Sequence, residues 1–288
     1  MDVIKPSDID ENWDVVIKPA VGLFDINFKE IWNYRDLLSL FVRRDFVAKY
    51  KQTILGPLWF FIQPLLTTIT FTIVFGNIAQ ISTDGLPQML FYMSGITMWN
   101  YFSDCLSSTS SVFTQNASIF GKVYFPRLIM PMSIIVSNLI KFSIQFSLLI
   151  LFWVYFYMQG AEISFNWNLL LLPLMILLMA LMGLGLGMII SSLTTKYRDL
   201  TFLVSFGVQL LMYASPVIYP LSTIPEKYKI FILANPMTGI IEGFRFAFLG
   251  VGTFTLDLLI YPSVFTFIVM VIGILIFNQV QKSFMDTV

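Results

Sequence analysis

The chain has no histidine and only one cysteine, Cys105. A single thiol excludes an intrachain disulfide and a cysteine metal site. Without histidine, most metal sites are excluded, as is every nucleophile that a histidine base would activate. The sequence also lacks a Walker glycine-lysine motif, so the chain should not bind ATP in the P-loop manner. We therefore expect no catalytic residue, no metal site and no cofactor in this chain.

Charged residues are also scarce. They make up 12% of the chain, whereas 57% of the residues are hydrophobic and the mean hydropathy is +0.79. A soluble core cannot absorb that much apolar surface, so the composition indicates a membrane protein. The net charge is zero and the basic residues gather in short loops, which gives no indication of nucleic-acid binding. Residues 1–18 lack an apolar core segment, so we expect no cleaved signal peptide.

The stretch from Arg35 to Gly76 organises the rest of the chain. Leu58 to Ile78 is almost wholly apolar and, at about 1.5 Å per residue, is long enough to cross a hydrocarbon core of about 30 Å. Five basic residues precede it within the segment 35–51, and the positive-inside rule places them on the cytoplasmic side. Residues 28–56 are amphipathic, which predicts an interface helix on the membrane surface. Residues 1–27 form a polar cytoplasmic lead.

The apolar segments predict an all-α polytopic membrane protein with six transmembrane helices per protomer, contained in residues 57–288. The predicted spans are 58–78, 87–107, 128–158, 167–193, 200–218 and 258–279. Both ends of the chain are then cytoplasmic. Of the 17 Lys and Arg residues, 13 fall on the segments that this topology places inside, three fall outside and Lys141 lies within a span. The opposite orientation would invert this asymmetry.

Two features inside the predicted spans allow more than one interpretation. Lys141 is the only basic residue in an apolar run, and it is either functional or a side chain that snorkels to the interface or lines a cavity without chemistry. Gly183, Gly185 and Gly187 sit in an apolar helix and follow no strand, so we interpret them as a helix-packing face rather than a nucleotide-binding motif.

The segment 219–257, between spans five and six, is interrupted by proline and glycine. Its apolar pieces of about ten to twelve residues cannot span a bilayer, which predicts short re-entrant helices. Glu242 and Arg245 lie at i,i+3 on one of them. The pair either serves a function at the outer face or only makes the helix soluble.

Four sequence runs carry a resemblance to a known family: KYKQTILGPLWFFIQP from Lys49, KVYFPR from Lys122, SPVIYP from Ser215 and LANPMTGIIEGFRFAFLG ending at Gly250. In this order they resemble the permease subunit of type-2 ATP-binding-cassette exporters. The polysaccharide branch, which exports O-antigen, capsule and teichoic-acid polymers, is the most similar. The resemblance covers nearly the whole chain from about Phe28.

The resemblance implies an assembly and a site for each function. Such permeases are homodimers in the bacterial cytoplasmic (inner) membrane, each paired with two copies of a separate ABC ATPase subunit that binds ATP and Mg²⁺. A lipid-linked polysaccharide, O-antigen above all, passes between the protomers. The coupling loop would be about 107–127 and the periplasmic gate region about 219–257, with Glu242 and Arg245 at the pore mouth. The residues expected to couple to the ATPase are Lys122, Tyr124, Phe125, Pro126, Arg127, Arg43 and Arg44.

Aromatic residues make up 16% of the chain, and sugars stack their apolar faces on aromatic rings. We therefore consider four rings of the first two spans as channel-lining candidates. They are Trp59, Tyr92, Trp99 and Tyr101. Trp and Tyr also form interfacial belts in any membrane protein, and this alternative stays open for each of them.

Two other functions are compatible with a polytopic membrane protein. No acidic residue lies in the middle of a predicted span, which argues against a carrier driven by protons or sodium. An enzyme acting on lipid-linked sugars would need carboxylates or histidine at the membrane face, and Glu242 and Asp257 are the best candidates. An exporter of the same family could also carry a drug or a small lipid.

Overall fold

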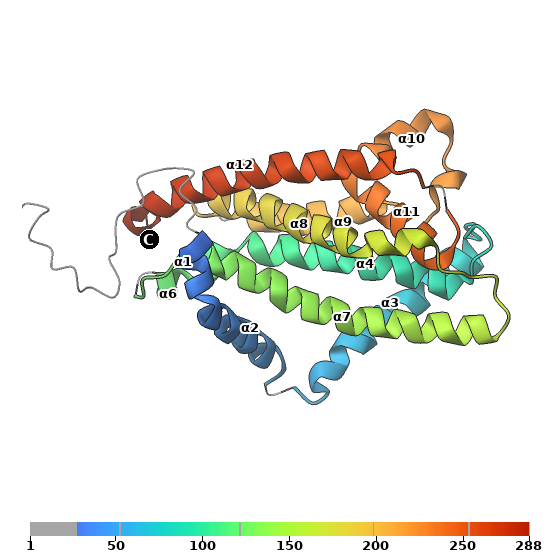
Figure 1. Cartoon of the computed structure of the whole chain (residues 1–288), viewed down its shortest axis with the longest axis horizontal. Helices are drawn as coiled ribbons and strands as arrows, with labels where there is room; N and C mark the ends of the chain where they lie inside the picture. The colour runs from blue at the N-terminus through green and yellow to red at the C-terminus, as the bar shows by residue number, and fades with distance from the viewer. Residues whose placement is uncertain (1–27, 52, 121, 198, 253, 288) are drawn as a thin grey trace, which may run out of the picture.

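Helices account for all the regular structure that the computed structural model describes, in residues 28–51, 53–120, 122–197, 199–252 and 254–287. The predicted polar lead, 1–27, lies outside the described residues. Most of the long helices run roughly along the long axis of the molecule (Figure 1). The all-α fold that the sequence predicts is confirmed.

The amphipathic segment ahead of the first apolar run forms two helices, α1 (Phe28–Asn33) and α2 (Arg35–Tyr50). Helix α2 packs against α7 and turns Phe41 into the core, while Leu40 and Val47 stay exposed. The chain then reverses at Gly56, whose φ of +51° is a conformation that favours glycine. The short 3-10 helix η2 (Gly56–Leu58) leads into the first apolar helix.

That first apolar helix is continuous through a proline. It consists of α3 (Trp59–Phe71) followed by a π-helical segment, η3 (Thr72–Ile78). Pro64 lacks the N–H that would bond to the preceding turn, and Thr68 donates its hydroxyl to the Pro64 carbonyl at 2.7 Å. Threonine side chains thus compensate for backbone polarity inside this apolar segment.

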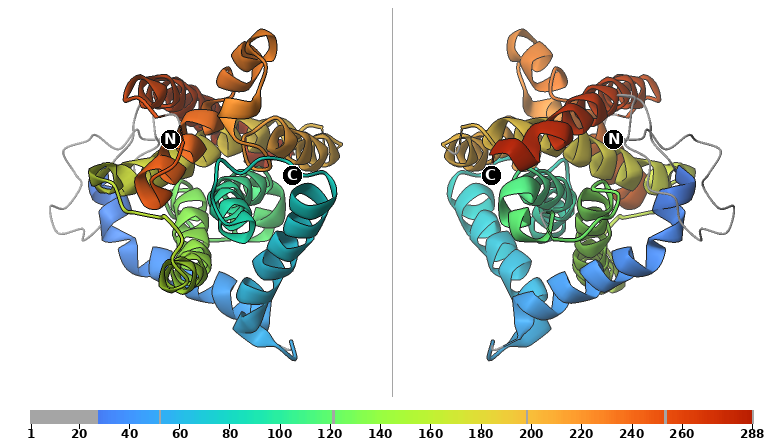
Figure 2. Two further views of the ribbon diagram at one scale, coloured as in Figure 1. Left: turned by 90° about the vertical axis from the view of Figure 1, so that its right-hand side faces the viewer. Right: turned by 90° about the vertical axis from the view of Figure 1, so that its left-hand side faces the viewer.

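Helix α4 (Gln88–Thr109) lies inside the helix bundle and contacts α3, α7, α8, α9 and α11. The view along the long axis shows it enclosed by its neighbours (Figure 2). Most of its side chains between Leu90 and Leu106 are buried. Because neighbouring helices surround it, α4 can carry polar residues that a lipid-facing helix would not tolerate. Two short helices follow it, α5 (Val112–Gln115) and α6 (Ala117–Phe120).

The next two long helices form an antiparallel pair, α7 (Ile129–Met158) and α8 (Leu172–Thr194), joined through η4 (Trp167–Leu171). The glycines of α8 are packing positions, as the sequence predicts. A Cβ at Gly187 would lie 2.5 Å from the Thr109 Cβ of α4, and a Cβ at Gly185 would lie 3.0 Å from the Met270 backbone on the last helix. Small residues therefore allow α8 to approach helices on both sides.

The chain then forms shorter elements before its last long helix. They are α9 (Leu200–Tyr213), η5 (Leu221–Thr223), α10 (Glu226–Leu233), α11 (Pro236–Leu249) and α12 (Asp257–Thr287). The predicted fifth segment, 200–218, is too long at its C-terminal end. Its helix stops at Tyr213, because Pro216 provides no N–H and disfavours helical geometry in the residue before it.

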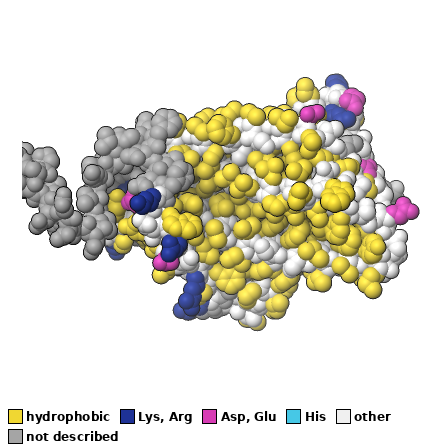
Figure 3. Space-filling view, in the orientation of Figure 1, with side chains coloured by type: hydrophobic (Ala, Val, Ile, Leu, Met, Phe, Trp, Pro, Cys, Tyr) yellow, Lys and Arg dark blue, Asp and Glu magenta, His cyan; other side chains and the backbone are white. Residues whose placement is uncertain are grey.

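In the described part of the chain, four helical stretches are long and apolar enough to cross a membrane. They are Gly56–Ile78, Ile129–Met158, Trp167–Thr194 and Asp257–Gln281. Helix α9 is apolar but shorter. The visible face of the molecule is largely hydrophobic between its two ends, and the charged side chains gather at those ends (Figure 3). This distribution is that of a polytopic membrane protein.

Candidate functional site

Helix α11 begins and ends with strong local signals. The Asn235 side chain accepts a hydrogen bond from the Met237 N–H at 3.0 Å, and Pro236 occupies the first helical position. Gly250 ends the helix in the left-handed conformation, with φ of +79°. Between these caps, Glu242 and Arg245 lie one turn apart and project from the same side of the helix.

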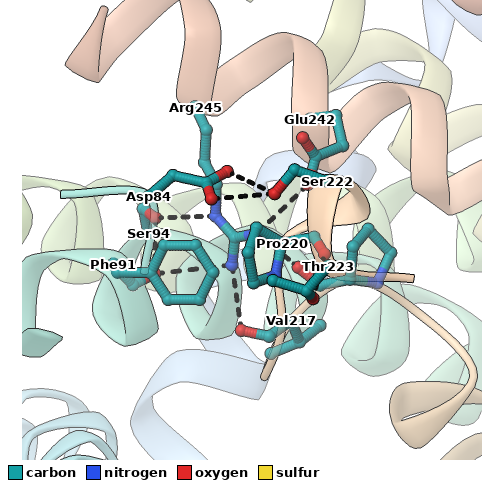
Figure 4. Close-up of polar contacts among 10 residues, drawn as sticks. Asp84, Phe91, Ser94, Val217, Pro220, Ser222, Thr223, Glu242 and Arg245 are labelled. Atoms are coloured by element: carbon teal, nitrogen blue, oxygen red, sulfur yellow. Dashed lines mark hydrogen bonds and ion pairs between the residues drawn. The ribbon is translucent and has the colours of Figure 1, made fainter. Parts of the chain in front are cut away.

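Arg245 is the centre of a polar network inside the protein (Figure 4). Its side chain is 2% exposed, and its Nη1 lies 3.4 Å from Glu242 Oε1. Nη1 also donates to the Pro216 carbonyl, and Nη2 donates to the Val217 carbonyl at 2.9 Å. On α4, the guanidinium carbon lies 3.7 Å from the centre of the Phe91 ring. One buried cation thereby joins α11, α4 and the turn after α9.

The neighbouring loops are tied to the same network. The Ser222 hydroxyl donates to the Asp84 carboxylate at 2.8 and 2.9 Å, which links η5 to the loop before α4. The Leu221 backbone lies close to the Glu242 carboxylate. Gly95 leaves the necessary space, because a Cβ there would lie 2.7 Å from Arg245 Nη2. Two helices and the turn after α9 therefore meet at Arg245, and the Ser222–Asp84 contact lies beside them.

The burial of Glu242 and Arg245 excludes one of the two interpretations that the sequence allows for this pair. Glu242 is 1% exposed, so the alternative that the pair only makes the helix soluble is wrong. The pair lies inside the protomer rather than on an open surface. Its role at a pore mouth stays a prediction.

The predicted coupling residues lie at the opposite end of the molecule and divide into two groups. Lys122 and Tyr124 are exposed, whereas Phe125 is buried among aromatic rings. Pro126 and Arg127 are partly buried. Partial burial raises the pKa of the Tyr124 phenol, and the nearby Glu30 carboxylate and Tyr34 phenol raise it further. Lys122 and Tyr124 thus remain free to meet a partner protein.

Arg127 has contacts within the chain. Its Nη1 donates to the Gln281 carbonyl near the end of α12, and its guanidinium carbon lies 5.6 Å from the Phe120 ring centre. Partial burial lowers the pKa of the Arg127 guanidinium from its ordinary value. A change at Arg127 would therefore disturb the protein itself as well as any partner contact.

An aromatic cluster joins this loop to distant segments. Phe125 lies 5.7 Å from Phe41 of α2 and 5.8 Å from Phe120, measured between ring centres. Phe113 of α5 stacks on Phe277 of α12 at 4.5 Å. We call Phe41, Phe113, Phe120, Phe125 and Phe277 the loop aromatic cluster. It packs α2, the α5–α6 region and α12 together.

The two arginines of α2 differ in their surroundings. Arg43 is exposed, whereas Arg44 is partly buried and bonds to Asp45 at 2.8 Å. The Arg44 guanidinium also covers the Phe41 ring at 4.8 Å, which places it beside the loop aromatic cluster. Contact of either arginine with an ATPase stays a prediction.

The four channel-lining candidates do not share one surface. Tyr92, Trp99 and Tyr101 are at most 3% exposed and belong to the main hydrophobic core, whereas Trp59 is 46% exposed. In this conformation, the three buried rings do not reach the surface of the chain. A channel-lining role for all four stays a prediction, and Trp59 alone is accessible.

Lys141 has an acidic partner, which offsets the free-energy cost of placing its charge in an apolar helix. Its Nζ lies 2.6 Å from Asp104 Oδ2 on α4, and both side chains are partly buried. An ion pair inside the bundle stabilises both charges, so Lys141 need not snorkel to the interface. The sequence places both residues near one end of their spans but contains no signal for the pairing of α7 with α4.

Several residues of both sites have no local sequence signal. The carbonyls of Pro216 and Val217 bind Arg245 through the backbone, so their side chains carry no information about the role. Phe41, Phe113 and Phe277 look like ordinary apolar positions in the sequence. Asp84 is the exception, because an acidic residue in a short loop beside a span could have been considered with Glu242.

Comparisons with known proteins agree over most of the chain. A family model described as ABC-2 type transporter matches residues 36–249. The chain is 27% identical to the O-antigen export system permease protein RfbA of Klebsiella pneumoniae over 251 residues, which cover 87% of this chain and 94% of that protein. The protein of the same name from Myxococcus xanthus is 28% identical over 222 residues, covering 76% and 83%. The polysialic acid transport protein KpsM of Escherichia coli is 22% identical over 258 residues, covering 86% and 95%.

Proposed function

Since the chain belongs to the ABC-2 type transporter family, we propose that it is the membrane subunit of an exporter that moves a polysaccharide, O-antigen in its lipid-linked form, across the inner membrane. The observation that carries this proposal is the similarity to O-antigen export permeases along nearly their whole length. The chain is a multi-pass membrane protein and a transport subunit. The relative named for polysialic acid transport supports the same class of cargo.

The topology belongs to this proposal. We propose six spans, with α4 and α9 added to the four long apolar stretches. Helix α4 is enclosed by other helices and α9 has only 14 residues, which explains why neither is among those four stretches. Helices α1 and α2 would then lie at the cytoplasmic surface, and α10 and α11 would be re-entrant helices at the periplasmic side. The bias of Lys and Arg toward the predicted cytoplasmic segments supports this orientation and cytoplasmic termini.

The source of energy would be a separate protein. We propose a homodimer of this chain bound to two copies of an ABC ATPase, which would hold ATP and Mg²⁺. The loop of residues 107–127 is the proposed contact, because it presents exposed Lys122 and Tyr124 while Phe125 anchors it to α2 and α12 through the loop aromatic cluster. A push on the loop would therefore move two other elements.

At the periplasmic side, Glu242 and Arg245 would hold the gate region together. Their contacts reach α4 and the turn after α9, so a movement of α11 must break or carry these contacts. A lipid-linked glycan would pass between the two protomers. Trp59 is the one exposed member of the proposed aromatic path.

The first experiment is co-purification of the chain with the ATPase encoded beside it, followed by ATPase assays with and without lipid-linked glycan. We expect a stable complex whose ATP hydrolysis responds to the glycan. Failure to bind an ATPase would contradict the assembly that we propose. In cells, loss of the chain should trap completed glycan on the cytoplasmic side of the membrane.

Charge reversal tests the coupling loop. Lys122→Glu should lower glycan export while dimer formation remains intact, because Lys122 is exposed and has only a surface role in the fold. Lys227→Glu, an exposed change at the opposite end, is the matched control. Arg127→Glu should also uncouple hydrolysis from export, but it breaks the bond to Gln281 as well. Normal export by both loop variants would contradict the assignment.

A further inference from the structure

A polar cleft of about 370 Å³ lies between α2, the α4–α6 region and the start of α7. We call it the α2–α7 cleft. Helix α2 contributes Arg44, Asp45 and Ala48 to its wall, and α7 contributes Ser133, Ser137 and Asn138. Hydroxyl, amide and charged groups thus line a cleft in a protein whose surface is largely apolar. Residues 108–119 of the proposed coupling loop form one side of this cleft, whereas the proposed gate lies at the other end of the molecule.

The cleft carries one positive and one negative charge. Arg44 Nε and Nη2 both donate to the same oxygen, Asp45 Oδ1, at 2.9 and 2.8 Å. Among the described residues, Arg44 Nη1 and Asp45 Oδ2 have no hydrogen-bond partner. The ion pair therefore still offers a donor and an acceptor of opposite charge, side by side. A ligand with two matching charges would use both.

The α7 wall also contains polar atoms that the protein leaves unmatched. Ser137 Oγ and Asn138 Nδ2 are buried and have no hydrogen-bond partner within the described part of the chain. Asn138 is only 3% exposed and adjoins the Cys105 thiol, which is a weak hydrogen-bonding group. An unmatched buried polar group costs about 1–3 kcal/mol. A polar occupant of the cleft would supply the missing partners.

The surroundings of the cleft are suited to lipid. On α7, Met132, Val136 and Ile140 are exposed at one-turn intervals, next to the cleft residues Ser133 and Ser137. These apolar side chains continue along the hydrophobic helix away from the charged end. A molecule with a polar head in the cleft can therefore lay its acyl chains on α7.

We propose that the α2–α7 cleft binds the headgroup of a zwitterionic phospholipid with a primary ammonium, such as phosphatidylethanolamine. The phosphate would accept from Arg44 Nη1, and the ammonium would donate to Asp45 Oδ2. A purely anionic headgroup would meet the Asp45 carboxylate without a cation of its own. A trimethylated choline headgroup has no N–H to donate. The proposal does not rest on the polymer that is exported.

Native mass spectrometry of the purified full chain tests the headgroup. Phosphatidylethanolamine, phosphatidylcholine and phosphatidylglycerol with the same acyl chains are added in turn. We expect the ethanolamine lipid to bind about tenfold more tightly than the others, which matches the loss of one hydrogen bond to a charged group. Asp45→Asn and Arg44→Met should remove this preference. Arg43→Met is the matched control, because Arg43 is exposed on the same helix but does not line the cleft.

A second pair of variants tests the location without removing a charge. Ala48→Trp would fill the cleft from its exposed wall, whereas Val47→Trp adds the same ring to α2 outside the lining. We expect only Ala48→Trp to release the bound lipid. Equal binding of the three lipids, or unchanged binding by Ala48→Trp, would overturn the proposal. Displacement of the lipid by inorganic phosphate alone would identify a free anion as the ligand and overturn it as well.

Discussion

At the scale of single residues, the contacts of Arg245 have clear consequences for the fold. A guanidinium can donate five hydrogen bonds, and here it meets a carboxylate, two backbone carbonyls of one turn and an aromatic face. None of these partners is a long surface side chain that could move freely. The buried cation therefore specifies the position of the turn after α9 as well as that of α11.

Removing this cation should destabilise the protein strongly. Arg245→Met leaves the Glu242 carboxylate buried without its counter-charge, which costs about 3–5 kcal/mol in comparable pairs. The apparent unfolding temperature in detergent measures the effect. Lys229→Met is the control, because its pair with Glu226 is on the surface and such pairs contribute about 0.2–1 kcal/mol. Equal effects of the two changes would show that burial does not matter here.

The loop aromatic cluster allows a second comparison of single residues, on one helix. Phe277 is fully buried against Phe113, whereas Phe267 of the same helix is 70% exposed. Phe277→Ala should cost about 3–5 kcal/mol through the cavity that it creates. Phe267→Ala should change the unfolding temperature little. Thermal unfolding followed by intrinsic fluorescence measures both, and a larger loss for Phe267→Ala would contradict the packing.

At the scale of elements, the close approach of helices depends on α8. Its glycines alternate between neighbours, with Gly183 and Gly187 against α4 and Gly185 against α12. A helix that contributes no side chain at these points can pack with its backbone near both partners. This is why the most hydrophobic of the long helices also has many buried residues.

Alanine substitution at two glycines should have effects of opposite sign. Gly187→Ala forces a Cβ to within 2.5 Å of the Thr109 Cβ and should destabilise the protein. Gly207→Ala on α9 meets no atom within 4 Å and should stabilise its helix by about 1 kcal/mol. Unfolding in increasing concentrations of a denaturing detergent measures the stability of both variants. A neutral Gly187→Ala would mean that α4 and α8 can separate without cost.

The elements also show how far the sequence alone could lead. Apolar periodicity predicts the long helices near 58–78, 128–158 and 167–193 closely, because length and hydropathy are local properties. The end of α9 was predicted too late, because Val217 and Ile218 continue the apolar run beyond the proline that stops the helix. The surroundings of Arg245 depend on residues about 150 positions away, at Phe91 and Ser94. No local pattern encodes such contacts.

At the scale of the whole molecule, orientation is the property that function requires most directly. The two charged ends of the long axis differ in what they carry: the loop aromatic cluster and the basic helix α2 at one end, and the buried Arg245 network at the other. In the assembly that we propose, the first end would face the ATPase and the second would face the opposite compartment.

Cysteine labelling measures this orientation. The native Cys105 is buried, so an impermeant maleimide should leave the wild-type chain unmodified. In intact cells with a permeable outer membrane, Tyr228→Cys should react and Lys122→Cys should not, since both positions are exposed but lie at opposite ends. Inverted membrane vesicles should give the reverse pattern. Labelling of Lys122→Cys from outside would overturn the proposed topology.

The short helix α9 has a consequence for the membrane itself. Its 14 residues extend over about 21 Å, whereas the hydrocarbon core measures about 30 Å. Where α9 faces lipid, this hydrophobic mismatch must pinch the bilayer or draw headgroups and water inward along the helix. The bilayer beside α9 should therefore be thinner than the bilayer around the longer helices.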